Sequence, residues 1–144
     1  MHLKRREQGD GPRRPRLSYQ ADPIRDSLRV LGKKWTLLIL RDIAFLKLRR
    51  FGEVRQNNPG LTARVLSRRL REMREEGLVK RREEGTTVSY ALTGRGEDAV
   101  YVLLALLRYG IRYHMSSKCE FDQEEVMKKL HYEAPFEALH KSGH

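Results

Sequence analysis

The chain has 144 residues, of which 39% are hydrophobic and 34% are charged, a balance that suits one globular domain with extensions and excludes a disordered chain. The net charge is +11 and 21 of the 30 basic residues are arginine, so we expect an anionic partner, with nucleic acid favoured over a membrane surface. The only cysteine, Cys119, excludes an intrachain disulfide framework, and the longest apolar run, residues 99–107, is too short to cross a bilayer.

Residues 1–18 are rich in arginine, proline and glycine and show no apolar periodicity, which predicts a flexible basic arm. A short helix is expected over residues 23–31. Asp22 is a good N-cap residue, Pro23 suits the first helical turn, and Gly32 suits the stop.

The next segment, about 34–46, is apolar nearly all round and includes Trp35, so it is expected to be the central core helix. A third, short helix follows over residues 50–57. It should end at the Asn-Pro-Gly sequence of residues 58–60, because proline and glycine together cannot continue a helix.

Residues of about 62–76 combine a basic composition with a helical period. Leu66, Leu70 and Met73 fall within one narrow arc of a helical wheel. The opposite side carries polar and basic side chains: Arg64, Ser67, Arg68 and Arg71. Thr62 is positioned to cap this helix and Gly77 to end it. The segment therefore predicts a helix with one buried face and one arginine face, and the plain alternative is a solvated basic surface.

After Gly77 the period changes to two, which predicts a hairpin over residues 78–92 with its tip at Gly85. A long helix is expected from Gly94 to Tyr113. One side of it carries Val100, Leu103, Leu104, Leu107 and Ile111, and further apolar residues widen that surface: Tyr101, Val102, Leu106 and Tyr109. So much apolar surface on one helix indicates a subunit interface.

Three separated blocks then match one family in order along the chain. They are DPIRDSLRVLGKKWTLLILRDI, RRFGEVRQNNPGLTARVLSRRLREMREEGLVKRR and VSYALTGRG. Over roughly residues 20–112 the chain resembles the HxlR family of prokaryotic transcription regulators, which is related to the MarR group. The resemblance implies a mostly α-helical fold with a small β-hairpin wing (α+β), namely a winged helix-turn-helix with flanking dimerisation helices. This domain is expected over residues 19–113, between the basic arm and a helical extension over 114–144.

The resemblance also implies a function: a homodimer that binds a palindromic operator in double-stranded DNA, in the cytoplasm and at the nucleoid. The helix of about 62–76 becomes the recognition helix in the major groove, and the hairpin of 78–92 becomes the wing on its flank. The wing tip is acidic, so basic residues at the wing base are expected to make its contact. The DNA-contacting residues are then Thr62, Arg64, Ser67, Arg68, Arg71, Lys80, Arg81 and Arg82. The dimer interface is expected to use Ile24, Leu28, Val100, Leu103, Leu104, Leu107 and Ile111.

The chain departs from the family at one informative position. Members that sense oxidants or electrophiles carry a cysteine just before the proline of the first block, where this chain has Asp22, so thiol sensing by that route is not expected. A small-molecule effector of another kind stays open. Cys119 and the histidines match no compact zinc site, and no catalytic motif is present, so we expect no metal, no cofactor and no enzyme activity.

Two alternatives to an operator-specific regulator remain. The same charge and basic arm would suit a sequence-nonspecific architectural chromatin protein. A winged-helix module can also bind protein partners within a transcription complex. The ratio of specific to nonspecific DNA affinity separates the first of these alternatives from a regulator.

Overall fold

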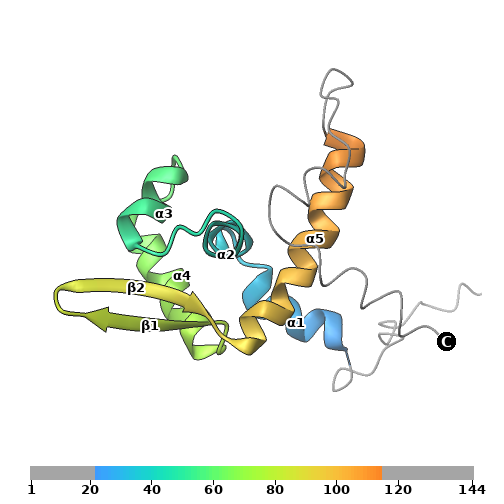
Figure 1. The fold of residues 1–144 in the computed structure, drawn as a ribbon. Coiled ribbons are helices and arrows are strands. Elements are labelled where there is room, and N and C mark those ends of the chain that lie inside the picture. The colour runs from blue at the N-terminus through green and yellow to red at the C-terminus, as the bar shows by residue number, and fades with distance from the viewer. Residues whose placement is uncertain (1–21, 115–144) are drawn as a thin grey trace, which may run out of the picture.

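The computed structural model describes residues 22–114 as five helices and one two-stranded hairpin (Figure 1). In chain order these are α1 (Pro23–Leu31), α2 (Thr36–Ala44), α3 (Phe51–Asn57), α4 (Ala63–Glu75), β1 (Val79–Glu84), β2 (Thr87–Leu92) and α5 (Gly94–His114). This is a winged helix-turn-helix, so the predicted fold class is confirmed. The expected basic arm, the C-terminal extension and Cys119 lie outside the described residues.

The two N-terminal helices begin in different ways. The side chain of Asp22 accepts a hydrogen bond from the backbone N–H of Arg25 at 3.1 Å, which caps α1 as predicted. A carboxylate therefore has a structural role at the position where thiol-sensing relatives carry cysteine. Helix α2 starts at Thr36, later than predicted, because Trp35 has a left-handed φ of 80°. Trp35 packs half-buried beside the core, so its predicted place inside the core helix was wrong.

The core lies where α2, α4 and the first half of α5 meet. Ile39 and Leu40 of α2 are fully buried. Helix α4 contributes Leu66, Leu70 and Met73, the three residues that the helical wheel placed on its buried face. Thr62 caps α4 by accepting a hydrogen bond from the backbone N–H of Val65 at 3.2 Å. The predicted division of α4 into a buried face and an arginine face is confirmed.

The hairpin pairs β1 and β2 antiparallel around a two-residue loop, with Val79 opposite Leu92 and Glu84 opposite Thr87. A third segment adds to its other edge, because the backbone N–H of Tyr90 donates to the carbonyl of Arg49 at 2.8 Å. The loop before α3 is thereby attached to the wing. Figure 1 shows the wing extending to one side of the molecule and α5 standing at the other.

The start of α5 is joined tightly to the start of β1. The backbone N–H of Thr93 donates to the carbonyl of Leu78 at 3.1 Å, and the Thr93 hydroxyl accepts from the backbone N–H of Gly96 at 3.0 Å. A Cβ added to Gly96 would lie 2.1 Å from the carbonyl oxygen of Leu78, which real atoms cannot tolerate. Gly96 therefore allows the first turn of α5 to lie directly on the base of the wing.

Candidate nucleic-acid interface

Helix α4 presents four side chains to solvent on the side opposite the core. They line one surface hollow, which we call the α4 hollow: Arg64, Ser67, Arg68 and Arg71. All four are exposed, and the three arginines have no carboxylate partner among residues 22–114. Because the opposite side of α4 is fixed in the core, these guanidinium groups are held on a rigid support. The structure thus brings together four of the predicted DNA-contacting residues, with Thr62 exposed at the start of the same helix.

A fourth arginine of α4 has different surroundings. The Nε of Arg69 donates to the backbone carbonyl of Lys34 at 2.8 Å, and its Nη1 lies 3.3 Å from the carboxylate of Glu72. The Glu72 carboxylate also forms an ion pair with Lys33, whose Nζ lies 3.2 Å away. Lys33, from the turn before α2, and this arginine therefore share one carboxylate. Arg69 fastens α4 to the N-terminal helices and is not available to a ligand.

A second hollow, the wing hollow, continues the basic surface from α4 to the base of the hairpin. Its lining residues are Arg71, Arg74, Glu75, Val79, Lys80 and Arg81. Arg71 belongs to both hollows, so the surface is continuous from α4 to the wing. Two of the three predicted wing residues, Lys80 and Arg81, therefore lie beside α4.

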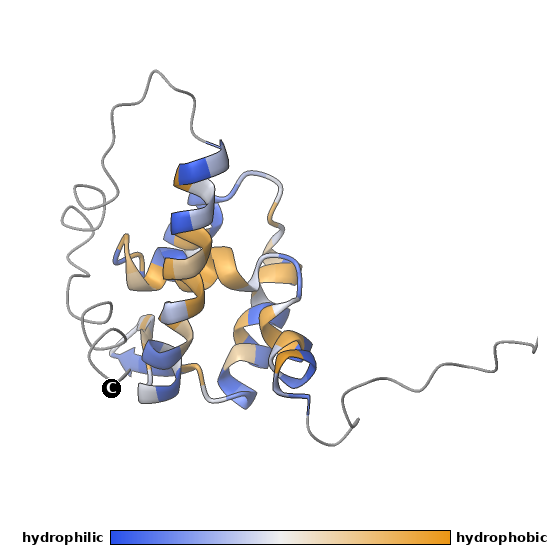
Figure 2. Ribbon diagram, turned by 90° about the vertical axis from the view of Figure 1, so that its right-hand side faces the viewer, coloured by the Kyte–Doolittle hydropathy of each residue, from blue (hydrophilic) through white to orange (hydrophobic). Residues whose placement is uncertain are grey.

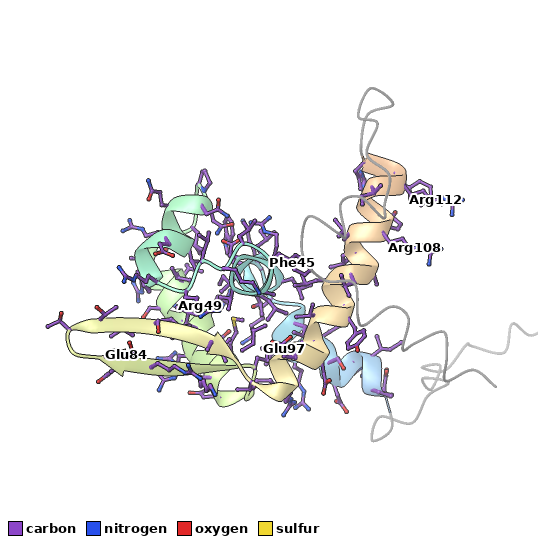
Figure 3. All side chains as sticks on the ribbon, viewed as in Figure 1. Phe45, Arg49, Glu84, Glu97, Arg108 and Arg112 are labelled. Carbon is purple, nitrogen blue, oxygen red and sulfur yellow. The ribbon has the colours of Figure 1, made fainter. Side chains whose placement is uncertain are left out.

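Arg82, the third predicted wing residue, does not line the wing hollow. The strand register pairs Arg82 with Ser89 and Arg81 with Tyr90, so the two arginines point to opposite faces of the hairpin. Arg81 also forms an ion pair with Glu83, two residues further along the same face. The wing tip beyond it is acidic and exposed at Glu84, which Figure 3 labels. Positive charge is thus limited to the wing base.

One polar network that the sequence analysis missed lies between α2 and the end of α3. Asp42 of α2 is fully buried, and its carboxylate accepts two hydrogen bonds from the Arg41 guanidinium, at 2.8 and 2.9 Å. It also accepts from the side-chain amide of Asn58 at 2.6 Å, and that amide donates to the carbonyl of Val54 at 2.7 Å. The network connects α2 with the turn that leads from α3 into α4. An aspartate inside a nearly all-apolar helix was the signal that could have revealed it, since a buried charge must have partners.

The predicted dimer residues separate into three groups by burial. Ile24 and Leu28 of α1 are exposed, and α1 buries none of its own residues in the domain. Val100, Leu103 and Leu104 of α5 are buried against the protomer's own helices. Their apolar surface is already covered, so a partner would have almost none of it to contact. The remaining two, Leu107 and Ile111, are half-buried in an apolar groove between α2 and α5.

The exposed apolar surface of α5 lies on another side of that helix. Its members are Val102, Leu106, Tyr109 and Tyr113. Three of these were noticed in the sequence as surplus apolar residues, but the interface was assigned to the other side. Figure 2 is viewed from the side of α5 and shows hydrophobic positions recurring along α5 up to a hydrophilic end. Helix α5 therefore has a buried apolar face and an exposed one.

Between residues 22 and 114 no helix is long and apolar enough to pass through a membrane. No three histidine, cysteine, aspartate or glutamate side chains gather there in a way that could hold a metal ion. The basic surface of α4 and the wing base is the most distinctive polar feature of this domain.

Comparison with known proteins agrees with this geometry. The family model described as HxlR-like helix-turn-helix matches residues 30–118. An uncharacterised HTH-type transcriptional regulator of Synechocystis sp. is 33% identical over 101 residues, which are 68% of this chain and 74% of the relative. A similar regulator of Mycobacterium bovis is 35% identical over 98 residues, which cover 66% of this chain but only 61% of the longer relative.

Among solved structures, this chain is similar to a Thermoplasma volcanium protein described as a possible HxlR family transcriptional factor. The TM-score is 0.54 at 38% identity, covering 61% of this chain and 81% of that one. The family match spans the helix-turn-helix, the wing and α5, so it includes both hollows and the buried network. The chain belongs to the HxlR family of DNA-binding helix-turn-helix transcriptional regulators, and it is not an enzyme.

Proposed function

We propose that this chain controls transcription as a homodimer that binds a palindromic operator, with α4 in the major groove and the wing base on the flanking backbone. Within each half-site, Arg64, Arg68 and Arg71 would read or clamp the DNA, with Thr62 and Ser67 beside them. Lys80 and Arg81 would hold the neighbouring phosphates. Arg82, which points to the face of the hairpin opposite to Arg81, stays a candidate for a phosphate contact.

The observation that carries the proposal is the free state of the three arginines in the α4 hollow. Other arginines of this domain form ion pairs with a nearby carboxylate, as Arg69 does with Glu72 and Arg95 does with Glu76. Arg64, Arg68 and Arg71 form no ion pair with any carboxylate of the described chain. An arginine fork without an internal partner is suited to bind guanine edges or phosphate oxygens in two places at once.

The dimensions of the face fit the major groove. Residues 64 to 71 of a helix span about 10 Å, which is close to three base-pair steps. The major groove is wide enough to admit one helix, so these side chains can reach several base edges from it. Because many protein–DNA hydrogen bonds go to phosphates, we expect part of this arginine set to position the protein and part to select the sequence.

The homodimer is supported by the apolar surface that the protomer leaves uncovered. Helix α1 exposes Ile24 and Leu28, and α5 exposes a stripe that includes Leu106. A soluble monomer rarely keeps a contiguous apolar surface of this kind open to water. A two-fold dimer would cover it and would present two α4 hollows to half-sites one helical turn, or a multiple of it, apart.

The direct test is selection of bound sequences from a random DNA duplex pool, followed by titration of the selected duplex and a scrambled one at the same salt concentration. A palindromic consensus, bound about 10³-fold or more tightly than the scrambled duplex, is the expected result. Equal affinity for both duplexes would favour an architectural protein. Absence of binding to any duplex would favour a module that binds protein partners.

A further inference from the structure

We propose that Lys34 binds a DNA phosphate on the wall of the major groove opposite the wall that the wing base binds. This inference rests on the operator binding proposed above and deepens it. It adds a phosphate contact from outside α4 and the wing, so that each half-site is held on both of its strands. The contact comes from the segment between α1 and α2, residues 32–35, which we call the α1–α2 turn.

The α1–α2 turn lies on the flank of α4 that faces away from the wing. At about 100° per residue, Arg74, which lines the wing hollow, lies about 80° to one side of the middle of the arginine face, and Glu72 lies about 80° to the other side. Lys33 and the backbone of Lys34 contact this second flank, through Glu72 and Arg69. Figure 1 agrees, because the wing extends to the left of α4 while α1 and α2, which the turn joins, lie to its right.

Two contacts hold Lys34 on this flank. Its backbone carbonyl accepts the hydrogen bond from Arg69 at 2.8 Å. Its Nζ lies 5.4 Å from the centre of the Trp35 ring, within the range of a cation–π contact. The edge of that ring lies beside Gly60, where an added Cβ would be 3.9 Å from Cζ2 and Cη2. Gly60 comes two residues before Thr62, the N-cap of α4, so the ammonium group lies near the start of that helix.

Lys34 differs from its neighbour Lys33 in its pairing. Lys33 shares the Glu72 carboxylate with Arg69. Lys34 is exposed and forms no ion pair with any carboxylate of residues 22–114. An unpaired Glu72 would repel a phosphate on this flank, and its two basic partners offset that charge. The flank is therefore positive overall, and Lys34 supplies a cation that no described carboxylate engages.

A helix in the major groove lies between two phosphate backbones. The groove is about 12 Å wide and a helix with its side chains is about 10–12 Å across, so both flanks of α4 come close to phosphates. In the proposed complex Lys80 and Arg81 meet one backbone, and Lys34 then meets the other. A lysine is a compact point charge that suits a phosphate oxygen. Lys34 therefore adds affinity without adding a preference for sequence.

The contact is tested by the salt dependence of binding, with the full-length chain and the selected consensus duplex. Each phosphate that a protein neutralises contributes about 0.9 to the slope of log affinity against log salt concentration. Lys34→Gln should lower that slope by about 1 for each bound subunit, and should weaken binding to the consensus and scrambled duplexes by the same factor, about tenfold at low salt. Lys33→Gln removes the same charge from the neighbouring, paired position and should leave the slope unchanged. Lys34→Arg keeps the charge and should keep the slope.

The place of the contact is tested with methylphosphonate, an uncharged replacement introduced at one phosphate of the consensus duplex at a time. Replacements on both walls of the groove should weaken binding of the wild-type chain. For Lys34→Gln, one of these replacements should no longer matter, because its contact is already lost. For Lys80→Gln, the replacement that no longer matters should lie on the opposite wall.

Three results would overturn the contact. A slope for Lys34→Gln equal to that of wild type means that Lys34 neutralises no phosphate. Equal slope losses from Lys33→Gln and Lys34→Gln would reduce the effect to net charge. Insensitivity of Lys34→Gln and Lys80→Gln to the same phosphate would place both lysines on one wall. Failure of the proposed function looks different. The wild-type chain then binds no duplex, which removes this contact as well, or it prefers no sequence while the slope loss of Lys34→Gln persists.

Discussion

Helices α4 and α5 both bury one apolar face in the same core, and they differ in what the opposite face offers. On α4 the outer face carries unpaired arginines at Arg64, Arg68 and Arg71. On α5 the outer face carries apolar side chains, from Val102 to Tyr113. Both helices are held equally firmly by the core, so the chemistry of the free face distinguishes them. A free cationic face is suited to an anionic polymer, and a free apolar face to another protein surface.

The comparison is tested most strongly by removing one leucine from each face of α5. Leu104 is 1% exposed and lies in the core, so Leu104→Ala should lower the free energy of unfolding by about 2–5 kcal/mol at every protein concentration. Leu106→Ala, two residues away on the outer face, should change the stability of the isolated protomer by less than about 0.5 kcal/mol. Urea denaturation at several protein concentrations measures both. Equal losses from the two variants would mean that α5 has no free face.

The support beneath α4 can be weakened from its buried side. Asn58→Ala removes the amide that donates to Asp42 and to the carbonyl of Val54. It should cost about 1–3 kcal/mol of unfolding free energy, because buried polar atoms lose their partners. Asn57→Ala is the matched control, since Asn57 is exposed and makes no such contact. If both variants melt at the wild-type temperature, the buried network does not hold the turn before α4.

The free face of α4 is tested by operator binding. Arg68→Ala should weaken binding by about 1–3 kcal/mol, through loss of a base or phosphate contact, while the melting temperature stays within a degree or so of wild type. Arg71→Ala should behave in the same way. Arg108→Ala removes the same charge from the far side of the domain, where Figure 3 places it, and should have little effect. Fluorescence anisotropy with a labelled operator compares all three, and equal losses would reduce the role of α4 to net charge.

The smallest expected effect concerns the wing. Glu83 holds Arg81 in an exposed ion pair, so Glu83→Gln should release that arginine and tighten DNA binding by about 0.2–1 kcal/mol. Glu84→Gln removes the same charge one residue further on, where no ion pair is formed within the described chain. Glu83→Gln should therefore have the larger effect in the same anisotropy assay. Identical gains would show that general repulsion from phosphate, and not the pair with Arg81, sets the contribution of the tip.

Periodicity predicted α4 well and α5 only in part, for a physical reason. On α4 the apolar residues occupy one narrow arc, so Leu66, Leu70 and Met73 could have only one buried face. On α5 apolar residues occupy two sides, and a helical wheel shows no reason why Leu104 rather than Leu106 enters the core. That choice depends on where α2 lies, which is a tertiary property.

The buried network and the start of α2 could not be predicted from the sequence for a similar reason. Asp42 and Asn58 are 16 positions apart and meet only because α3 turns the chain back towards α2. Trp35 was expected inside a helix on its hydrophobicity, but its backbone is left-handed, so the helix begins one residue later, at Thr36. The bounds of the wing and its tip at Gly85 followed closely from the alternating pattern, because a two-residue turn leaves a hairpin little choice.

The close contact at Gly96 has a mechanical consequence. The first turn of α5 rests on the carbonyl of Leu78, and Thr93 bonds to the same carbonyl, so no flexible linker separates α5 from the wing. If two copies join through α5, the angle at which each α5 leaves Thr93 sets how far apart the two wings stand. A larger side chain at Gly96 would change that angle, and with it the half-site spacing that the dimer can span. Operator geometry would then be encoded in one glycine that never touches DNA.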